Sequence, residues 1–248
     1  MTPPTKREAY RADLAQIHHE GFGDHARAAS QVLHEGLKCQ HLPAGLVVDL
    51  GCGSGILSKA VDKAGYEVHG YDISPAMVEL ARKLVPRGEF HCASILDANL
   101  PACVAVTAIG EVFNYLFDRR NSAARLNKLL GRIEQALVPG GLLLFDVALV
   151  GREPAGRRRG FSEGPNWACL FEAVEDRASQ MLTRTITTFL RQGDSYRRDQ
   201  EVHKLRLFQK AELIEPLKAL GFRTRILRGY GEYAFPVGYL AVVATKPK

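Results

Sequence analysis

Residues 46–55, Leu-Val-Val-Asp-Leu-Gly-Cys-Gly-Ser-Gly, constrain the fold of this chain more than any other stretch. The apolar run Leu46–Val48 is rich in β-branched residues, which is typical of a buried strand. Asp49 is expected to end the strand, and the three glycines that follow turn the chain into a helix. Glycine suits such a turn because it lets the backbone approach a ligand and adopts positive φ readily. The stretch therefore predicts a strand, a ligand-binding turn and a helix.

Residues 67–72, Glu-Val-His-Gly-Tyr-Asp, repeat the scheme as a second short strand that ends in a carboxylate. In an open α/β sheet, ligands bind beyond the carboxyl ends of the strands. Asp72 at such an end can accept hydrogen bonds from both hydroxyls of a ribose. The two motifs together predict a nucleoside site.

The spacing of the glycines indicates which nucleoside is bound. A nicotinamide dehydrogenase has Gly-x-Gly-x-x-Gly, whereas this loop has Gly-x-Gly-x-Gly led by Asp49. At this point the chain resembles the class I S-adenosylmethionine-dependent methyltransferases, whose first motif is Asp-x-Gly-x-Gly-x-Gly. The resemblance extends to Asp72 and to Leu-Val-Pro-Gly-Gly at 137–141, so it covers roughly residues 46–147. It implies S-adenosylmethionine as the cofactor and S-adenosylhomocysteine as its product.

Strands and helices alternate regularly through this region, which favours a parallel, doubly wound sheet. Further strands are expected at 89–92, 104–109 and 142–147, and two more at about 222–228 and 237–245. Helices are expected at 56–64, 74–84, 122–137 and 210–220. The resemblance implies an α/β fold with a Rossmann-like seven-stranded sheet, mostly parallel with an antiparallel last strand.

The predicted organisation has three parts. Residues 1–40 form an N-terminal helical cap in which Tyr10, Leu14 and Ile17 share one helical face, with a break at 17–25 before a second helix. Residues 41–147 and 210–248 form the S-adenosylmethionine-binding domain. Residues 148–209 form an antiparallel β-insertion over the active site, with strands at about 166–175, 180–191 and 195–208. A mobile connection at 151–165, rich in glycine and arginine, leads into it.

The resemblance implies a set of cofactor-binding residues by motif position. The glycine loop would contact the methionine part of the cofactor, Asp72 the ribose, and the residues just beyond it the adenine. Residues after the third and fourth strands would complete the site. The residues with these roles are Asp49, Gly51, Cys52, Gly53, Gly55, Asp72, Ile73, Met77, Ser94, Ile95, Ile109 and Gly110.

Two positions leave alternatives open. Ser94 stands where the family commonly has an acidic residue bonded to the adenine amino group, so a backbone contact or Asp97 is expected to substitute. The N-terminal layout resembles glycine N-methyltransferase and the amino-sugar N-methyltransferases, in which an N-terminal arginine neutralises the cofactor carboxylate. Arg27 is at a comparable separation from the glycine loop, and its alternative role is a solvated helix face.

Methyl transfer requires a positioned acceptor and the exclusion of water. A general base helps because an amine must arrive unprotonated and a hydroxyl must lose its proton. The candidate catalytic residues are His18, His19, Glu111 and Tyr115, with His203 as a further possible base. Aromatic side chains in the insertion and near the C-terminus are candidates for an apolar substrate wall or for core packing: Trp167, Phe171, Tyr196 and Tyr233.

The composition of the 248 residues narrows the partners. The net charge of +6 is modest and forms no basic stripe, and the five cysteines lack metal-ligand spacing. We therefore expect a cytoplasmic protein without a signal peptide, metal site, membrane segment or nucleic-acid partner. The expected function is methylation of a nitrogen or oxygen of a small molecule, by a monomer or homodimer. A peptide or protein N-methyltransferase and a cofactor-binding regulatory protein without turnover are the alternatives.

Overall fold

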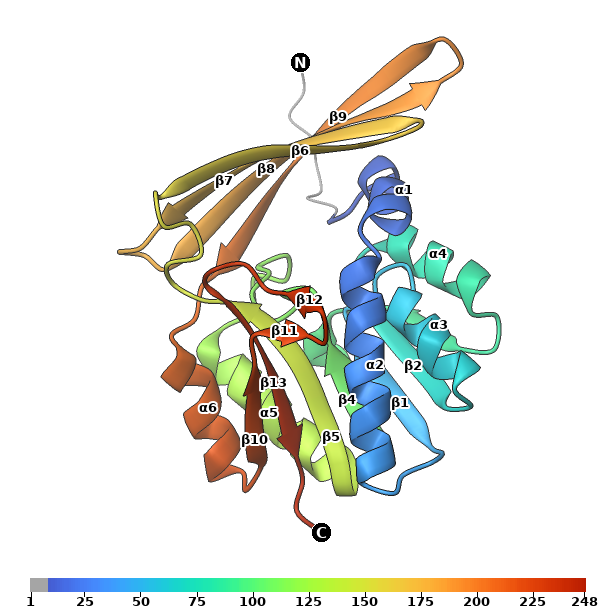
Figure 1. The fold of residues 1–248 in the computed structure, drawn as a ribbon, viewed down its shortest axis with the longest axis vertical. Coiled ribbons are helices and arrows are strands. Elements are labelled where there is room, and N and C mark those ends of the chain that lie inside the picture. The colour runs from blue at the N-terminus through green and yellow to red at the C-terminus, as the bar shows by residue number, and fades with distance from the viewer. Residues whose placement is uncertain (1–8) are drawn as a thin grey trace.

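The computed structural model describes residues 9–248, and its centre is one seven-stranded sheet (Figure 1). The strand order is β10-β13-β5-β4-β1-β2-β3. The bounds are β1 (Leu46–Leu50), β2 (Glu67–Asp72), β3 (Glu89–Cys92), β4 (Cys103–Ala108), β5 (Leu137–Ala148), β10 (Arg223–Leu227) and β13 (Tyr239–Thr245). β13 pairs antiparallel with both of its neighbours, and the other pairs are parallel. The expected Rossmann-like sheet is therefore confirmed.

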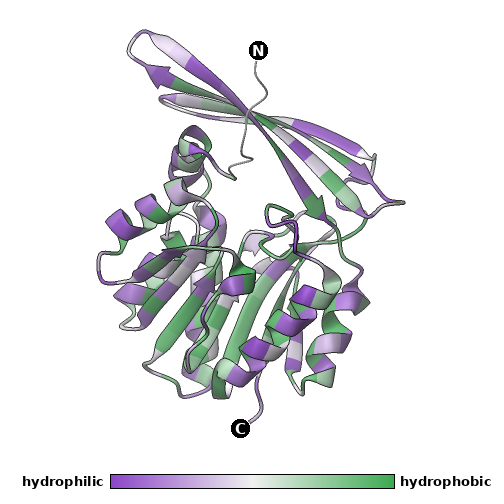
Figure 2. Ribbon diagram, turned by 180° about the vertical axis from the view of Figure 1, so that it is seen from behind, coloured by the Kyte–Doolittle hydropathy of each residue, from purple (hydrophilic) through white to green (hydrophobic). Residues whose placement is uncertain are grey.

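Helices cover both faces of this sheet. One face packs against α2 (Asp24–Cys39), α3 (Ile56–Lys63) and α4 (Pro75–Leu84), and the other against α5 (Ala123–Ala136) and α6 (Lys210–Ala219). Figure 2 shows that the strands between the two helical layers are mainly hydrophobic. Leu33 and Leu37 of α2 and Leu129 of α5 are almost fully buried, and each such side chain contributes about 1.5–3 kcal/mol. This packing fixes the strand ends that carry the motifs.

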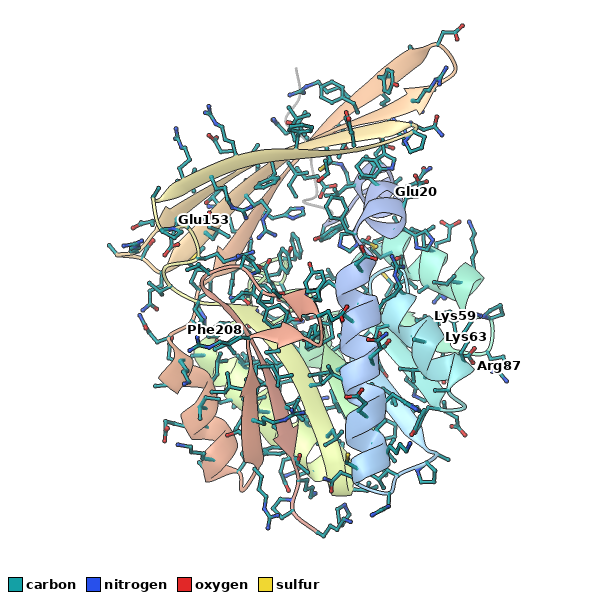
Figure 3. The ribbon with its side chains drawn as sticks, viewed as in Figure 1. Glu20, Lys59, Lys63, Arg87, Glu153 and Phe208 are labelled. Atoms are coloured by element: carbon teal, nitrogen blue, oxygen red, sulfur yellow. The ribbon has the colours of Figure 1, made fainter. Side chains whose placement is uncertain are left out.

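The insertion is a separate four-stranded antiparallel sheet at the carboxyl ends of the core strands (Figure 1). Its strands are β6 (Arg157–Gly164), β7 (Trp167–Asp176), β8 (Met181–Gln192) and β9 (Ser195–Arg206). β8 and β9 pair over their full length around the turn at Gly193, as the sequence indicated. Phe208, labelled in Figure 3, lies where the insertion rejoins the core, beside Leu149.

The expectation of a mobile connection at 151–165 is wrong, because β6 occupies most of it. β6 pairs residue by residue with β7, and its glycines make room for aromatic rings on the partner strand. Gly160 lies opposite Phe171, and a Cβ there would come within 2.6 Å of that ring. Gly164 lies opposite Trp167, where a Cβ would come within 2.5 Å of the indole. These glycines serve cross-strand packing rather than mobility.

The first helix also differs from its expectation. α1 runs over Ala12–Gly21, so the expected break at 17–25 shrinks to Phe22 and Gly23. Leu14 and Ile17 lie on the buried face of α1, but Tyr10 precedes the helix with a φ of 47°. Residues 1–8 of the expected cap lie outside the described residues.

Three short elements were not expected: the 3₁₀ helix η1 (Ile95–Asp97) and the strands β11 (Gly229–Tyr230) and β12 (Tyr233–Ala234). Among residues 9–248, the structure contains no helix long and apolar enough to cross a membrane.

Candidate active site

The glycine loop follows β1 and lies against the end of β2. The backbone N–H groups of Gly51 and Cys52 both donate to the carbonyl of Tyr71, at 2.7 and 3.0 Å. Gly51 has a φ of 68°, and a Cβ on it would come within 2.5 Å of Val112. Gly53 has a φ of 52°, and a Cβ there would have only the sulfur of Met77 nearby, at 4.0 Å. The space in front of Gly53 is thus left open to a ligand.

Asp72 ends β2 beside this loop. Its Oδ2 accepts a hydrogen bond from the Gly53 N–H at 2.9 Å, and its Oδ1 accepts one from the Ser74 N–H at 2.8 Å. Burial raises the pKa of Asp72, and these backbone hydrogen bonds partly oppose the rise. The carboxylate is therefore fixed in orientation while its remaining lone pairs are available at the pocket wall.

A single pocket brings most of the predicted cofactor residues together. Those that line it are Gly51, Gly53, Asp72, Ile73, Met77, Ser94, Ile95, Ile109 and Gly110. Of the predicted catalytic residues, His18 and Tyr115 also line it. The open glycine cradle, the carboxylate at a strand end and the apolar side chains beside it fit a nucleoside cofactor such as S-adenosylmethionine.

Other predicted cofactor residues lie behind the pocket wall or away from it. Asp49 is buried and accepts hydrogen bonds from Ser58 and Thr107, both at 2.7 Å. Burial raises the pKa of Asp49 to about 6. Gly55 packs against the backbone of Ala81 on α4.

Two more predicted cofactor residues, Cys52 and Arg27, do not line the pocket either. Cys52 is buried, and burial raises the pKa of its thiol. Arg27 is exposed and forms an ion pair with Asp24 at 2.8 Å.

His18 is the histidine that faces the pocket. Its ring stacks on Phe22 with centroids 5.8 Å apart and meets the ring of Tyr10 edge-on at 5.3 Å. Its Nδ1 is buried, and no residue in the described part of the chain hydrogen-bonds it. Burial, with the neighbouring histidines, lowers the pKa of His18 to about 4, so the imidazole is neutral near pH 7. A neutral imidazole with an unused nitrogen can accept a hydrogen bond from a ligand.

Of the other candidate catalytic residues, His19, Glu111 and His203 do not line the pocket. His19 is hydrogen-bonded through Nδ1 to Ser54 at 2.9 Å. Glu111 has a φ of 63°, is buried, and accepts a hydrogen bond from Arg184 of β8 at 2.9 Å. His203 is buried and hydrogen-bonded to Glu201 at 2.9 Å.

The structure also brings to the pocket residues that the sequence did not single out: Tyr10, Leu96, Val112, Phe117, Asp118 and Asn121. Four of these lie in the segment that follows β4. The density of aromatic and polar residues after that strand was the available signal, of which the prediction used only Glu111 and Tyr115.

Tyr10 and Tyr115 form a hydroxyl pair at the pocket wall. Their oxygens are 3.0 Å apart, and Arg184 donates to the Tyr115 hydroxyl at 3.1 Å. Burial raises the pKa of both phenols, so both keep their protons near neutral pH. One phenolic proton can be shared between the two oxygens, which leaves the other free to donate to a ligand.

Of the four aromatic candidates, two follow the expectation of core packing, and none forms a substrate wall at the pocket. Trp167 packs with Leu14 and Ile17 of α1, and Phe171 is partly buried beside them. Tyr196 is exposed on β9, and Tyr233 is exposed on β12. The first two rings join the insertion to α1, and none of the four lines the pocket.

Asp146 of β5 holds the turn at Gly110 and Glu111, and Gly110 lines the pocket. It is fully buried, and its Oδ1 accepts hydrogen bonds from the backbone N–H groups of Gly110 and Glu111 at 2.9 and 2.7 Å. The hydroxyls of Tyr239 and Tyr230 donate to it, at 2.6 and 2.9 Å, and His25 is hydrogen-bonded to it at 2.8 Å. These partners hold the turn in which two successive residues have positive φ.

Comparison with known proteins shows what this geometry resembles. Residues 47–141 match a family model described as a methyltransferase domain. A putative methyltransferase, YqeM of Bacillus subtilis, is 27% identical over 191 residues, which are 72% of this chain and 74% of YqeM. Ribosomal protein L11 methyltransferase of Thermus thermophilus is 31% identical over 157 residues, which are 62% of this chain and 57% of that protein.

Solved structures share nearly the whole fold. DesVI of Streptomyces venezuelae superimposes with a TM-score of 0.79 at 22% identity, over 97% of this chain and all of DesVI. CalS10 of Micromonospora echinaspora, an amino pentose methyltransferase solved with S-adenosylmethionine bound, has a TM-score of 0.73 at 19% identity. That match covers 98% of this chain and 100% of CalS10. The core sheet and the β-insertion therefore belong to one shared architecture.

Proposed function

We propose that this protein uses S-adenosylmethionine to transfer a methyl group to a nitrogen or oxygen of a small molecule; the match of residues 47–141 to a methyltransferase domain supports this proposal. The observation that carries the proposal is the meeting of Gly53, Asp72 and His18 at one pocket. The first two fit the cofactor, and the third is a neutral imidazole beside the place where an acceptor would enter.

The residues of this chain would divide the work as follows. Asp72 would hold the ribose, and the backbone at Gly53 would lie against the methionine part. S-adenosylmethionine supplies an electrophilic methyl group when it is bound. Ile109 and Gly110 would line the end of the pocket where the methyl group meets the acceptor. Asp146 holds the turn at Gly110 in place. Positioning of this kind is the main requirement of an in-line methyl transfer.

His18 is the proposed general base. Its neutral state and unpartnered Nδ1 suit it to accept a hydrogen bond from an uncharged amine or a hydroxyl of the acceptor, and to receive the proton that becomes acidic as the methyl group is transferred. Only one hydroxyl donates within the Tyr10–Tyr115 pair. The other hydroxyl would donate a hydrogen bond to an oxygen of the acceptor next to the reacting atom. Tyr10 and Tyr115 line the pocket and are also hydrogen-bonded to residues of the insertion. This arrangement supports a small acceptor held under the sheet of the insertion.

Small-molecule specificity is supported by the named neighbour CalS10, an amino pentose methyltransferase, whose fold matches over the insertion as well. We therefore favour a metabolite acceptor over a protein or peptide.

The test has two stages. Calorimetry of the purified chain with S-adenosylhomocysteine should show binding, and NAD should show none. Mass spectrometry of reactions with amine and hydroxyl metabolites, amino sugars included, should then reveal products that gain one methyl group. NAD binding without a response to S-adenosylhomocysteine would overturn the proposal. Cofactor binding with no methylated product from metabolites or peptides would establish the alternative of a regulatory protein without turnover.

A further inference from the structure

The end of α1 carries three ring-bearing side chains that do different things beside the pocket. His18 lines the pocket. His19 is hydrogen-bonded through Nδ1 to Ser54 of the glycine loop at 2.9 Å. Phe22 follows the helix, and its N–H donates to the carbonyl of His18 at 3.0 Å. The helix end is therefore tied to the glycine loop by His19, and Phe22 lies one helical turn beyond His18.

Phe22 covers one face of the His18 imidazole. The two rings are stacked, with centroids 5.8 Å apart and an angle of 23° between their planes. Trp167 of β7 lies next to Phe22, with ring centroids 6.1 Å apart, and the ring of Tyr10 meets the imidazole edge-on at 5.3 Å. Phe22 is 38% exposed and is the most exposed of these three neighbours. It is therefore the ring that separates His18 from the solvent.

Trp167 supports Phe22 from the side of the insertion. The indole is buried and packs with Leu14 and Ile17 on the inner face of α1. Gly21, directly before Phe22, makes this approach possible, because a Cβ on it would come within 2.5 Å of the indole. The position of the Phe22 ring thus depends on both α1 and the insertion.

The surroundings of His18 show what keeps its imidazole neutral. Its Nδ1 is buried, and no residue in the described part of the chain hydrogen-bonds it. The titratable groups around it are His19 on its own helix, His25 of α2, His203 of β9 and the phenol of Tyr10. The three histidines oppose its protonation, and burial, the larger effect, lowers its pKa to about 4. Since none of these groups is an anion that would favour the imidazolium, exclusion of water is the main reason for the neutral state.

We propose that Phe22, supported by Trp167, is a positioning residue that keeps water away from His18 and holds its imidazole in the pocket wall. Phe22 does not line the pocket, so it acts through His18. This inference rests on the proposed function, in which His18 accepts a hydrogen bond from the acceptor and then receives its proton. An imidazole that is shielded from water keeps its lone pair for the acceptor.

The test follows the protonation of His18 by NMR in protein with isotope-labelled histidine. His18→Gln identifies the His18 signal, because that signal alone disappears. In the unaltered protein the signal should keep its neutral position from about pH 8 down to about pH 5, since the pKa is about 4. In Phe22→Ala water reaches the ring, so the proton affinity of His18 should rise at least about tenfold, and the signal should titrate above about pH 5.

Two variants serve as controls. Phe22→Tyr keeps the ring, and His18 should behave as in the unaltered protein. Phe161→Ala removes a phenylalanine that is 72% exposed on β6, and it should leave the His18 signal unchanged as well. The signal of His69, on β2, should stay the same in every variant, which shows that the core sheet is intact.

A His18 signal that stays neutral down to about pH 5 in Phe22→Ala would overturn the inference, because another group would then exclude the water. So would a His18 that titrates near its ordinary pKa of 6.5 in the unaltered protein. Calorimetry with S-adenosylhomocysteine should give the same affinity for Phe22→Ala and the unaltered protein, and a weaker affinity would show that Phe22 acts on the cofactor site instead. Absence of binding by the unaltered protein would overturn the proposed function, whereas the titration would still decide whether Phe22 shields His18.

Discussion

The carboxylate of Glu201 accepts a hydrogen bond from the backbone N–H of Tyr10 at 3.0 Å, and it accepts a second from the N–H of Arg11 at 2.8 Å. Glu201 lies on β9 of the insertion, and the same face of that strand carries Asp199, paired with Arg11, and Arg197, paired with Asp13. Tyr10 also lines the pocket, and its carbonyl accepts a hydrogen bond from Ser74 at 2.8 Å. The N-terminal segment is thereby held between the core and the insertion.

These contacts lead to a prediction about residues 1–24. Their removal should leave the seven-stranded sheet folded, because none of its strands lies in this segment and α2 loses only its first residue, Asp24. It should abolish turnover. Cofactor binding should fall by less than turnover does, since Gly53 and Asp72 remain in place. Circular dichroism, calorimetry with S-adenosylhomocysteine and a methyl-transfer assay measure the three quantities. A truncated protein that works at the full rate would show that the segment takes no part in the reaction.

A point variant tests the same contact without a deletion. Glu201→Gln keeps the shape of the side chain but weakens its two bonds to the backbone of Tyr10 and Arg11. Hydrogen exchange at residues 9–13 should become faster. In the unaltered protein S-adenosylhomocysteine should slow exchange in this segment, and in Glu201→Gln the slowing should be smaller. Glu163→Gln, an exposed carboxylate on β6, is the matched control and should leave exchange unchanged.

Asp72→Ala should weaken the binding of S-adenosylhomocysteine by about 1–3 kcal/mol, the usual cost of losing a charged hydrogen-bond acceptor. The variant also leaves the N–H groups of Gly53 and Ser74 without their acceptor, so a modest loss of stability should accompany it. Calorimetry measures the first effect and thermal unfolding the second. Glu67→Ala, at the exposed start of the same strand, should change neither. Unaltered affinity in Asp72→Ala would mean that the ribose is held by other groups.

Asp146 should be the most costly of these carboxylates to remove. In Asp146→Ala five partners, two of them buried and three partly buried, lose their acceptor, so the free energy of unfolding should fall by about 3–5 kcal/mol. Asp146→Asn should lose much less, because its oxygen can still serve Gly110 and Glu111 while its amide faces Tyr230 and His25. Urea unfolding separates the two variants. Equal losses would show that the charge, and not the geometry, stabilises the turn.

His18 should make stability depend on pH in a defined direction. The unfolded imidazole takes up a proton near its ordinary pKa of 6.5, whereas the folded one, with its pKa lowered to about 4, does not. The stability that depends on neutral His18 is therefore fully present above about pH 6.5 and is lost as the pH falls toward 4. The loss amounts to at most about 3 kcal/mol.

The variant His18→Gln isolates this effect. Asp49 acts in the opposite sense over a similar range, because its pKa is raised to about 6 and protonation relieves its burial. Asp49 is present in both proteins, so its contribution cancels in the difference. Urea unfolding at several pH values should show the unaltered protein losing more stability than His18→Gln between about pH 6.5 and 4. Parallel curves would mean that His18 is solvated in the folded protein.

Local motifs made the core of this fold predictable from sequence. The strand–turn–helix at the glycine loop and the carboxylate of Asp72 are defined by neighbouring residues, and the pocket contains them. Tyr10 was not predictable in the same way, because its position depends on Glu201 at the other end of the chain. Asp118 depends similarly on Arg120 and on a loop from a different strand. β6 was missed because glycine usually weakens a strand, whereas here it faces aromatic rings across the pair.

The two points where the insertion joins the core lie side by side. The N–H of Val150 donates to the carbonyl of Phe208 at 3.1 Å, and the N–H of Phe208 donates to the carbonyl of Ala148 at 3.3 Å. The chain thus leaves β5 and returns to α6 through one narrow neck. An evolving gene could exchange everything beyond that neck as one cassette, while the glycine loop and Asp72 stayed untouched. Acceptor preference could then diversify among descendants that all inherit the same cofactor.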